Sequence, residues 1–185
     1  MEILDLGSID RHFIRAVEEE SGQDVSHCYQ CGNCTAGCPL SFAYDIPVHQ
    51  IMRLIQLGQK EKVLRSHAIW LCATCETCTT RCPCEVDVAR VMDTLRIMAR
   101  REGTVSEEGV RRFYDTFLDS VKRHGRLYEV GLLMRYNLLS GRPFADADLG
   151  PKVLGKGKLH FLPENIKGVE AIKGIFDRFA KKRGA

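Results

Sequence analysis

Two cysteine blocks of identical spacing constrain this 185-residue chain more than any other feature of its sequence. Each block reads C-x2-C-x2-C-x3-C-P, and together the blocks hold eight of the nine cysteines. A fold that satisfies this pattern must bring several thiols together at two places, through metal or through disulfides. The cysteines lie at Cys28, Cys31, Cys34 and Cys38, before Pro39, and at Cys72, Cys75, Cys78 and Cys82, before Pro83.

This spacing predicts iron–sulfur clusters. Three thiolates two residues apart on a tight loop reach three irons of one cube, and the fourth, just before proline, points away toward the other cluster. Structural zinc is the alternative, but it prefers paired C-x2-C units, which a third and fourth cysteine at these intervals do not match. We therefore predict two [4Fe–4S] clusters, one on Cys28, Cys31, Cys34 and Cys82, the other on Cys72, Cys75, Cys78 and Cys38.

The chain's ends and charge bear on its compartment and partners. The start, from Met1 to Asp5, has no basic or long apolar segment, so we expect no signal peptide. No apolar run approaches the roughly 18 residues that span a bilayer. We therefore expect a cytoplasmic protein without membrane contact, in which clustered cysteines bind metal.

The charge does not favour nucleic-acid binding. The formal net charge is +3, and two clusters of about −2 each would lower it to about −1. Residues 150–185 hold nine Lys and Arg against three Asp and Glu. This basic tail is not interleaved with an aromatic stacking platform, so we expect a protein partner rather than a nucleic acid.

Apolar periodicity outside the blocks predicts a mainly α protein without strands. We expect three regions: an N-terminal helix in 1–25, a two-cluster domain in 26–102 and a helical docking extension in 103–185. Predicted caps are Ser8 with Gly22 as the stop, Asp45 with Pro47 in the first turn, and a Thr104–Glu107 capping box. The predicted helices are 8–20, one ending at Gly58, 60–67, one from 88 to near Gly103, 104–124, 127–139 and one opening at Pro163, with a loop at 145–160.

Several residues beside the blocks leave alternatives open. Cys84 is a packing residue, a spare ligand or a redox-active thiol. Tyr29 and Trp70 are expected to cover the clusters and limit access of water. The second block's threonines either donate hydrogen bonds to sulfur and tune the potential, or simply fit tight loops; they are Thr74, Thr77, Thr79 and Thr80.

The helical segment between Cys38 and Cys72 resembles the α-helical ferredoxin domain of the iron–sulfur subunits of succinate dehydrogenase and fumarate reductase. The chain lacks the C-x4-C-x2-C spacing of the [2Fe–2S] domain in those subunits. The run from Cys28 to Pro39, the second block and the short length resemble the C subunit, an iron–sulfur protein, of the soluble heterodisulfide reductase of methanogens. The resemblance covers about residues 8–102.

The resemblance implies an electron relay within an oxidoreductase complex. In that family a flavin-containing, electron-bifurcating A subunit passes electrons through the C subunit to the B subunit. The B subunit carries Cys-Cys-Gly motifs and reduces the coenzyme M–coenzyme B heterodisulfide, and a hydrogenase or formate dehydrogenase module feeds the complex. This chain has no Cys-Cys-Gly motif, so we expect no substrate site and no catalytic residue on it.

Other functions remain as alternatives. The first alternative is a relay subunit of another anaerobic oxidoreductase, and the second is a freely diffusing dicluster carrier. A self-contained enzyme is disfavoured, because the sequence has no Gly-rich nucleotide fingerprint, P-loop or G-x-S-x-G elbow.

Overall fold

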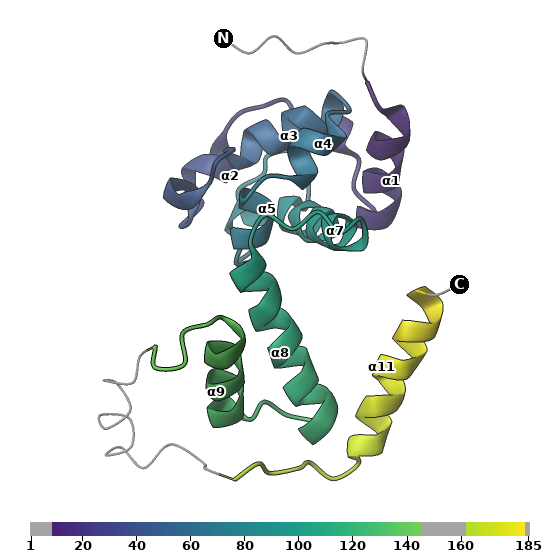
Figure 1. Ribbon diagram of the computed structural model, residues 1–185. Helices are drawn as coiled ribbons and strands as arrows, with labels where there is room; N and C mark the ends of the chain where they lie inside the picture. Colours follow the sequence, from purple (N-terminus) through teal and green to yellow (C-terminus); the bar gives the residue numbers. More distant parts are fainter. Residues whose placement is uncertain (1–8, 146–161, 184–185) are drawn as a thin grey trace. The chain divides into compact units, whose positions relative to one another are not determined.

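The computed structural model describes residues 9–145 and 162–183. The chain forms two compact units, Met1–Glu107 and Glu108–Ala185. The described residues contain helices and short turns but no strands, which confirms the predicted mainly α fold (Figure 1). In the described part of the chain, no helix has the length and apolar character that crossing a bilayer requires.

The first unit is a set of short helices, and each cysteine block consists of loop segments around one short helix of its own. α3 (Val48–Gln56) and α7 (Val88–Arg101) are its central helices, and each follows one cysteine block. α7 contacts α1, α4, α5 and α6, whereas α3 contacts α1, α2, α4 and η2. The other elements are α1 (Arg11–Ser21), η2 (Val25–His27), α2 (Asn33–Ala36), η3 (Ser41–Ala43), α4 (Lys60–Leu64), α5 (Ala68–Leu71) and α6 (Thr77–Thr80).

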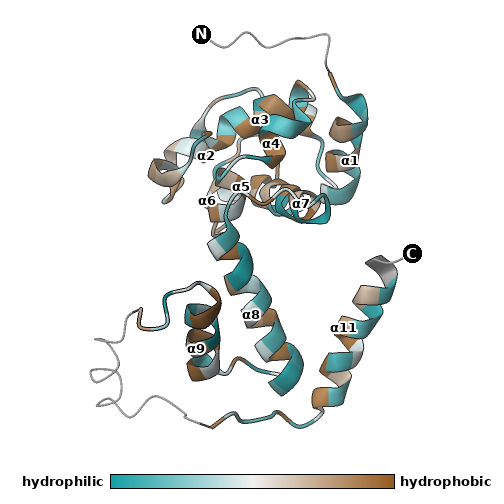
Figure 2. Cartoon of the chain, viewed as in Figure 1, coloured by the Kyte–Doolittle hydropathy of each residue, from teal (hydrophilic) through white to brown (hydrophobic). Residues whose placement is uncertain are grey.

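The core of this unit forms where the apolar faces of α3 and α7 are covered. Ile51 and Ile55 of α3 and Val91 and Leu95 of α7 are completely buried. Each such side chain contributes about 1.5–3 kcal/mol relative to exposure. Figure 2 shows the alternation of hydrophobic and hydrophilic positions along these helices. The predicted periodicity of both helices is therefore confirmed, including the end of α7 before Gly103.

The first helix begins later than predicted. α1 starts at Arg11 because the Asp10 side chain accepts a hydrogen bond from the Phe13 amide at 2.9 Å. The predicted cap, Ser8, lies outside the described residues. The predicted stop is confirmed: Gly22 has φ +65°, a left-handed conformation that glycine adopts without steric penalty.

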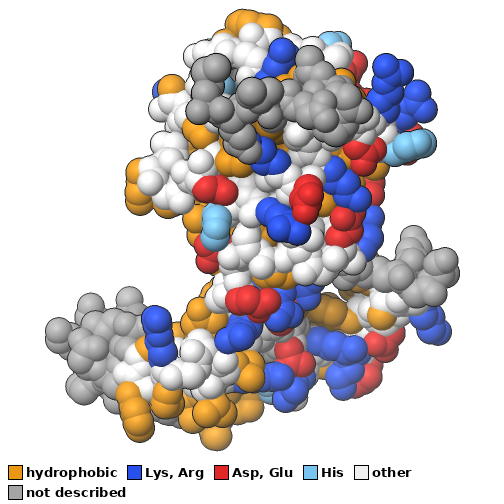
Figure 3. Space-filling view, turned by 45° about the horizontal axis from the view of Figure 1, so that its top comes forward, with side chains coloured by type: hydrophobic (Ala, Val, Ile, Leu, Met, Phe, Trp, Pro, Cys, Tyr) orange, Lys and Arg blue, Asp and Glu red, His pale blue; other side chains and the backbone are white. Residues whose placement is uncertain are grey.

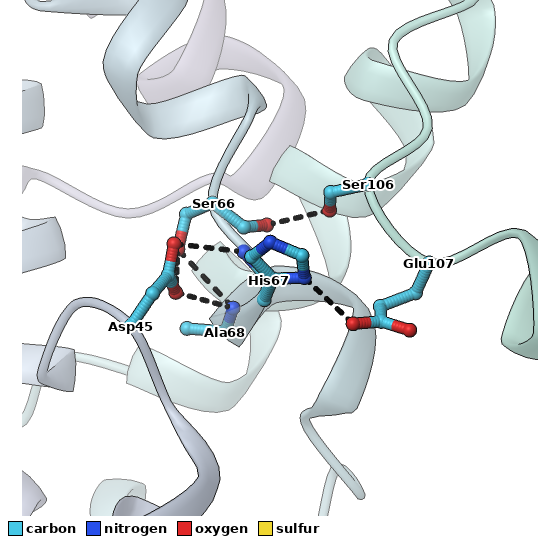
Figure 4. Close-up of polar contacts among 6 residues, drawn as sticks. All are labelled: Asp45, Ser66, His67, Ala68, Ser106 and Glu107. Atoms are coloured by element: carbon cyan, nitrogen blue, oxygen red, sulfur yellow. Dashed lines mark hydrogen bonds and ion pairs between the residues drawn. The ribbon is translucent and has the colours of Figure 1, made fainter.

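The prediction that Asp45 caps α3 is wrong. Pro47 is the cap residue of α3, and the Asp45 carboxylate turns to the start of α5 (Figure 4). It accepts hydrogen bonds from the Ser66 hydroxyl at 2.8 Å and from the amides of His67 and Ala68 at 3.1 and 3.0 Å. The helix predicted at 60–67 is α4, which ends three residues early, at Leu64, and a separate helix, α5, begins at Ala68.

The predicted capping box of Thr104 and Glu107 does not form. The Thr104 amide donates to the Ala99 carbonyl at 2.8 Å, which closes the end of α7. Glu107 instead contacts Nδ1 of His67 at 2.6 Å, and the neighbouring Ser106 hydroxyl donates to the Ser66 carbonyl at 3.0 Å (Figure 4). The segment that follows α7 is thereby attached to the start of α5.

The second unit contains α8 (Glu108–His124), α9 (Glu129–Leu139) and α11 (Val169–Arg183). α8 contacts both other helices, and its Phe113 ring meets Tyr136 of α9 edge-on at 5.6 Å between centroids. The end of α8 matches the prediction, and α9 begins two residues after the predicted start at Leu127. The predicted start of the last helix at Pro163 is wrong, because Gly168, with φ +85°, precedes a helix that begins at Val169.

Apolar side chains remain exposed on this second unit. Of the large apolar residues of α9, only Leu132 is buried. Figure 3 shows hydrophobic side chains, in orange, exposed on the surface of this unit. The predicted loop at 145–160 falls almost wholly outside the described residues. The exposed residues of α9 are Leu133, Met134, Leu138 and Leu139.

Candidate metal centre

The two cysteine blocks belong to a structural repeat that includes the helices after them. In the first half, the Thr35 hydroxyl accepts the backbone amide of His49, in the first turn of α3, at 3.0 Å. In the second half, the Thr79 hydroxyl accepts the amide of Ala89, in the first turn of α7, at 3.2 Å. These pairs are 14 and 10 positions apart, so the second half is four residues shorter. The repeat of the blocks was predicted from the cysteine spacing, but the repeat of the helices after them was not.

Backbone conformation follows the same repeat. The second residue after the first cysteine of each block is left-handed, with φ +67° at Gln30 and +51° at Thr74. The fourth residue is left-handed too, with φ +81° at Gly32 and +63° at Glu76. Left-handed conformation costs a non-glycine residue roughly 1–2 kcal/mol. Three such residues at matched positions indicate that the tight loop, and the direction in which its thiols point, is set by the surrounding fold.

The short helices inside the blocks bring the blocks together. α2 contacts α6, and the side chain of Arg81 lies over Gly37. A Cβ atom at Gly37 would lie only 2.6 Å from Cδ of Arg81, so glycine provides the space that the arginine occupies. Gly37 and Arg81 each precede the last cysteine of their block, Cys38 and Cys82. The two final cysteines therefore lie where the blocks meet.

Cys38 joins the thiols of the other block. A cavity holding about 370 Å³ of empty space, partly open to solvent, is lined by Cys38 together with Cys72, Cys75 and Cys78. Tyr44 also lines it. The pKa of Tyr44 is raised strongly, mainly by burial and to a smaller extent by a hydrogen bond to Cys38 and the nearby Cys72. These four thiols are the set predicted for the second cluster, and they surround one space.

The first block forms a second group of thiols. Cys34 is 8% exposed, and burial, with smaller contributions from Cys28 and Cys31, raises its pKa. Tyr29 lies beside Cys31, and loss of hydration together with Cys31, Cys84 and Cys82 raises the pKa of its phenol. Cys82 and Cys84 thus approach the first block from the second.

All nine cysteines are free thiols. Four of them, Cys38, Cys72, Cys75 and Cys78, line one cavity. A cubane binds four thiolates, one to each iron. The thiols that line the cavity therefore fit the ligand set of a [4Fe–4S] cluster. Among the described residues, no group of three His, Cys, Asp or Glu side chains that could hold a single metal ion is found.

Two thiols that line the cavity differ in acidity. Burial raises the pKa of Cys78 to about 11, so a metal bound to this thiol would displace its proton. Cys75 differs: hydrogen bonding with the Thr77 hydroxyl and amide lowers its pKa. The Cys75 Sγ–Thr77 Oγ1 distance is 3.4 Å.

The hydroxyls of three of the four threonines contact different groups. Thr77 contacts sulfur, as the tuning interpretation requires. The Thr79 hydroxyl is engaged with Asp87 at 2.9 Å and the Thr80 hydroxyl with the Glu76 carbonyl at 3.1 Å, so these two support the loop. Trp70 is 1% exposed. Tyr29 lies beside Cys31 with its ring 64% exposed, and its role in covering a cluster stays a prediction.

Two residues that were not predicted from the sequence each bind the backbone at the start of one block. Gln56, at the end of α3, donates from Nε2 to the carbonyls of Val25 and Cys28 at 2.8 and 2.9 Å. Arg96 of α7 donates to the carbonyls of Ile69 and Cys72 at 2.8 and 2.6 Å. An alignment of the two halves with a four-residue gap places Gln56 opposite Arg96, and that alignment would have revealed both.

Comparison with known proteins agrees with this geometry. Residues 24–86 match a family described as a 4Fe-4S dicluster domain. The C subunit of the H(2):CoB-CoM heterodisulfide,ferredoxin reductase of Methanothermobacter thermautotrophicus is 34% identical over 101 residues, 55% of each chain. The iron-sulfur C subunit of the CoB--CoM heterodisulfide reductase of Methanopyrus kandleri is 38% identical over 90 residues, 49% of this chain and 47% of its own. The corresponding C 2 subunit of Methanocaldococcus jannaschii is 33% identical over 114 residues, 57% and 61% of the two chains.

The matched region is limited to part of each protein. The chain spans about half the length of the curated relatives it matches. Within that region the family match includes both cysteine blocks, α3, α4 and α5. The chain therefore contains a 4Fe-4S dicluster domain, and several of its curated homologues are C subunits of heterodisulfide reductases.

Proposed function

We propose that this protein is the electron-relay subunit of a heterodisulfide reductase, with two [4Fe–4S] clusters as its redox groups. The observation that carries the proposal is the cavity in which Cys38 of the first block meets Cys72, Cys75 and Cys78 of the second. Ligands exchanged between the blocks would place two clusters close together. Short separation is what electron transfer between clusters requires.

The chain's residues would divide the work as follows. Cys28, Cys31, Cys34 and Cys82 would hold one cluster, and Cys72, Cys75, Cys78 and Cys38 the other. When bound, the clusters supply one-electron transfer at potentials set by charge, hydrogen bonds to sulfur and exposure. Thr77 is placed to donate a hydrogen bond toward the Cys75 sulfur once that thiol is deprotonated.

A relay fits the chain better than a complete enzyme. The sequence lacks the Cys-Cys-Gly motifs expected of the subunit that cleaves the disulfide. We propose that electrons arrive from a flavin-containing, bifurcating partner and leave to the Cys-Cys-Gly partner, which reduces the coenzyme M–coenzyme B heterodisulfide. The exposed apolar side chains of α9 and the basic sequence beyond residue 150 are the surfaces we assign to these partners.

Ligand exchange between the blocks has a sharp test. Single Cys→Ala variants are purified without air, reduced and examined by electron paramagnetic resonance (EPR). Exchange predicts that Cys38→Ala and Cys75→Ala lose the same cluster signal, whereas Cys31→Ala and Cys82→Ala lose the other. If Cys31→Ala and Cys38→Ala share one lost signal, each block holds its own cluster and the assignment is wrong.

The relay itself is tested by reconstitution. The flavin-containing and Cys-Cys-Gly partners are mixed with and without this chain, and reduction of the heterodisulfide is followed while the flavin-containing partner is kept reduced. We expect turnover only with the chain present, and none with Cys34→Ala, which removes a ligand. Turnover by the isolated chain would identify a catalytic subunit. A chain that binds neither partner would be a free carrier.

A further inference from the structure

The structural repeat places two chemically different side chains at one equivalent position. Gln56 and Arg96 each bind the carbonyl of the first cysteine in a block and the carbonyl three residues before it. Both project from the helix that follows the block. The contacts to Cys28 and Cys72 span 28 and 24 positions, the same four-residue difference found for the threonine contacts. The geometry is shared, but the charge is not.

Arg96 is held in a setting where its charge is poorly screened. Its side chain is 12% exposed, and two of its nitrogens are fixed on backbone carbonyls. The Asp93 carboxylate lies 3.5 Å from Nη1, and because it is 48% exposed, water screens its charge. A guanidinium remains charged at every physiological pH. The Cys72 loop therefore has a fixed positive charge at its first ligand.

The first block has a neutral amide at that place. Gln56 donates to Cys28 through Nε2, while its Oε1 accepts from Arg53 at 3.1 Å. Arg53 is exposed and lies beyond the glutamine. Its charge is therefore screened by solvent and stands one side chain farther from the Cys28 carbonyl.

Other charged residues also lie near the blocks. Glu76 stands where the first block has Gly32, and Arg81 lies over Gly37 at the junction of both blocks. Solvent screens both of these charges, and they have opposite signs. Asp87 is half-buried, and its carboxylate is bound by the Thr79 hydroxyl at 2.9 Å and the Arg90 amide at 3.0 Å. Arg96 is the less exposed of the cations, Arg81 and Arg96, that lie beside the second block.

We infer that Arg96 gives the two clusters different reduction potentials. Adding an electron makes a cluster more negative, and a nearby cation stabilises that reduced form. The cluster on Cys72, Cys75, Cys78 and Cys38 therefore has the higher potential, and the electron moves to it from the cluster on Cys28, Cys31, Cys34 and Cys82. This inference rests on the proposed relay and adds the order of its two clusters.

The repeat itself supplies the test variants. Arg96→Gln installs the side chain that performs the same bonding in the other half, so the loop retains its support. Gln56→Arg is the reciprocal change. Arg96→Lys keeps the charge but removes the forked donor, and Arg101→Gln removes an exposed arginine at the far end of α7 as the control. Potentials are measured by EPR-monitored redox titration of anaerobic protein, with iron content determined for every sample.

The expected result is a shift of one couple at a time. At a fixed ambient potential, Arg96→Gln lowers the reduced-to-oxidised ratio of the higher-potential couple about tenfold, equivalent to about 59 mV for one electron. Gln56→Arg raises the other, lower-potential couple. Arg96→Lys retains most of the wild-type value, and Arg101→Gln leaves both couples unchanged.

Each contrary result has a definite meaning. Full iron content with unchanged potentials in Arg96→Gln makes Arg96 a purely structural contact and overturns the inference. A shift of the lower-potential couple in Arg96→Gln reverses the assigned order. If Arg96→Gln loses iron, Gln56→Arg decides, and an unshifted couple there also overturns it. Wild-type protein without clusters refutes the proposed function instead, so the two failures are distinguishable.

Discussion

Gly58 offers a prediction whose size follows directly from the structure. This glycine follows α3 with φ +62°, and an added Cβ would lie 2.5 Å from the Asp10 backbone nitrogen and 3.0 Å from its oxygen. These are backbone atoms of the residue that caps α1, so they cannot rotate away. The Asp10 amide also donates to the Gly58 carbonyl at 3.3 Å, a bond that any displacement would weaken. Gly58→Ala must therefore separate α1 from the end of α3.

Three effects add in this variant. The left-handed conformation costs alanine roughly 1–2 kcal/mol. Overpacking against a fixed neighbour costs typically about 1–3 kcal/mol, and a weakened hydrogen bond about 0.5–1.5 kcal/mol. Alanine also restricts the unfolded chain, which returns about 0.4–1 kcal/mol. We expect the free energy of unfolding to fall by about 2–6 kcal/mol.

Gly103→Ala is the matched control. Gly103 has φ +74° but nothing within 4 Å of the added Cβ, so only the conformational cost applies. The unfolded-state effect is the same in both variants and cancels in their difference. Urea unfolding is followed by circular dichroism on iron-loaded, anaerobic protein, with equal iron content confirmed. With a slope of about 2 kcal/mol per molar urea, Gly58→Ala should unfold about 1–2 M earlier than the control. Equal midpoints would refute the argument from the Asp10 contact.

Three further predictions concern residues near the blocks. Thr79→Val should destabilise the protein by about 1–2 kcal/mol, because the Ala89 amide loses its acceptor, whereas Thr80→Val should have a smaller effect. Thermal unfolding compares the two variants, and equal losses of stability would contradict the role of Thr79. Asp45→Asn should cost about 0.5–2 kcal/mol at neutral pH, because hydrogen bonds to a charged acceptor are stronger than those to a neutral amide oxygen. Burial raises the pKa of Asp45, but hydrogen bonds from Ser66, His67 and Ala68 outweigh it, and its pKa in the folded protein is lowered. Wild type should therefore be more stable than Asp45→Asn above about pH 3.9, and should lose this advantage as the pH falls through the lower pKa of the folded state. A stability difference that does not depend on pH would refute this. Cys84→Ala should keep full iron content by chemical analysis, and loss of iron would make Cys84 a ligand.

Features governed by local repetition were predicted well from the sequence. The apolar spacing of 48–55 and 88–98 located α3 and α7, and Gly22 ended α1 as expected, because these signals act within a few residues. The cysteine spacing also indicated that Cys38 belongs with the second block. The cavity shows these thiols together, while ligation itself remains a prediction.

The wrong predictions share a physical cause, which is competition by distant partners. Asp45 precedes a helix and has the right chemistry for a cap, but its acceptor oxygens bind amides 22 and 23 positions later. Glu107 likewise turns to His67, 40 positions earlier, rather than to its own helix. Gln56 and Arg96 were missed because a neutral and a charged residue do not look equivalent until the four-residue offset between the halves is known.

The central claim is that eight thiolates hold two [4Fe–4S] clusters, and metal analysis tests it most directly. Protein purified without air should contain about eight irons and eight sulfides per chain, and should give EPR signals of reduced [4Fe–4S] clusters. The Cys72→Ala variant should lose about half of that iron. One or two zinc ions per chain, without sulfide and without an EPR signal, would contradict the account.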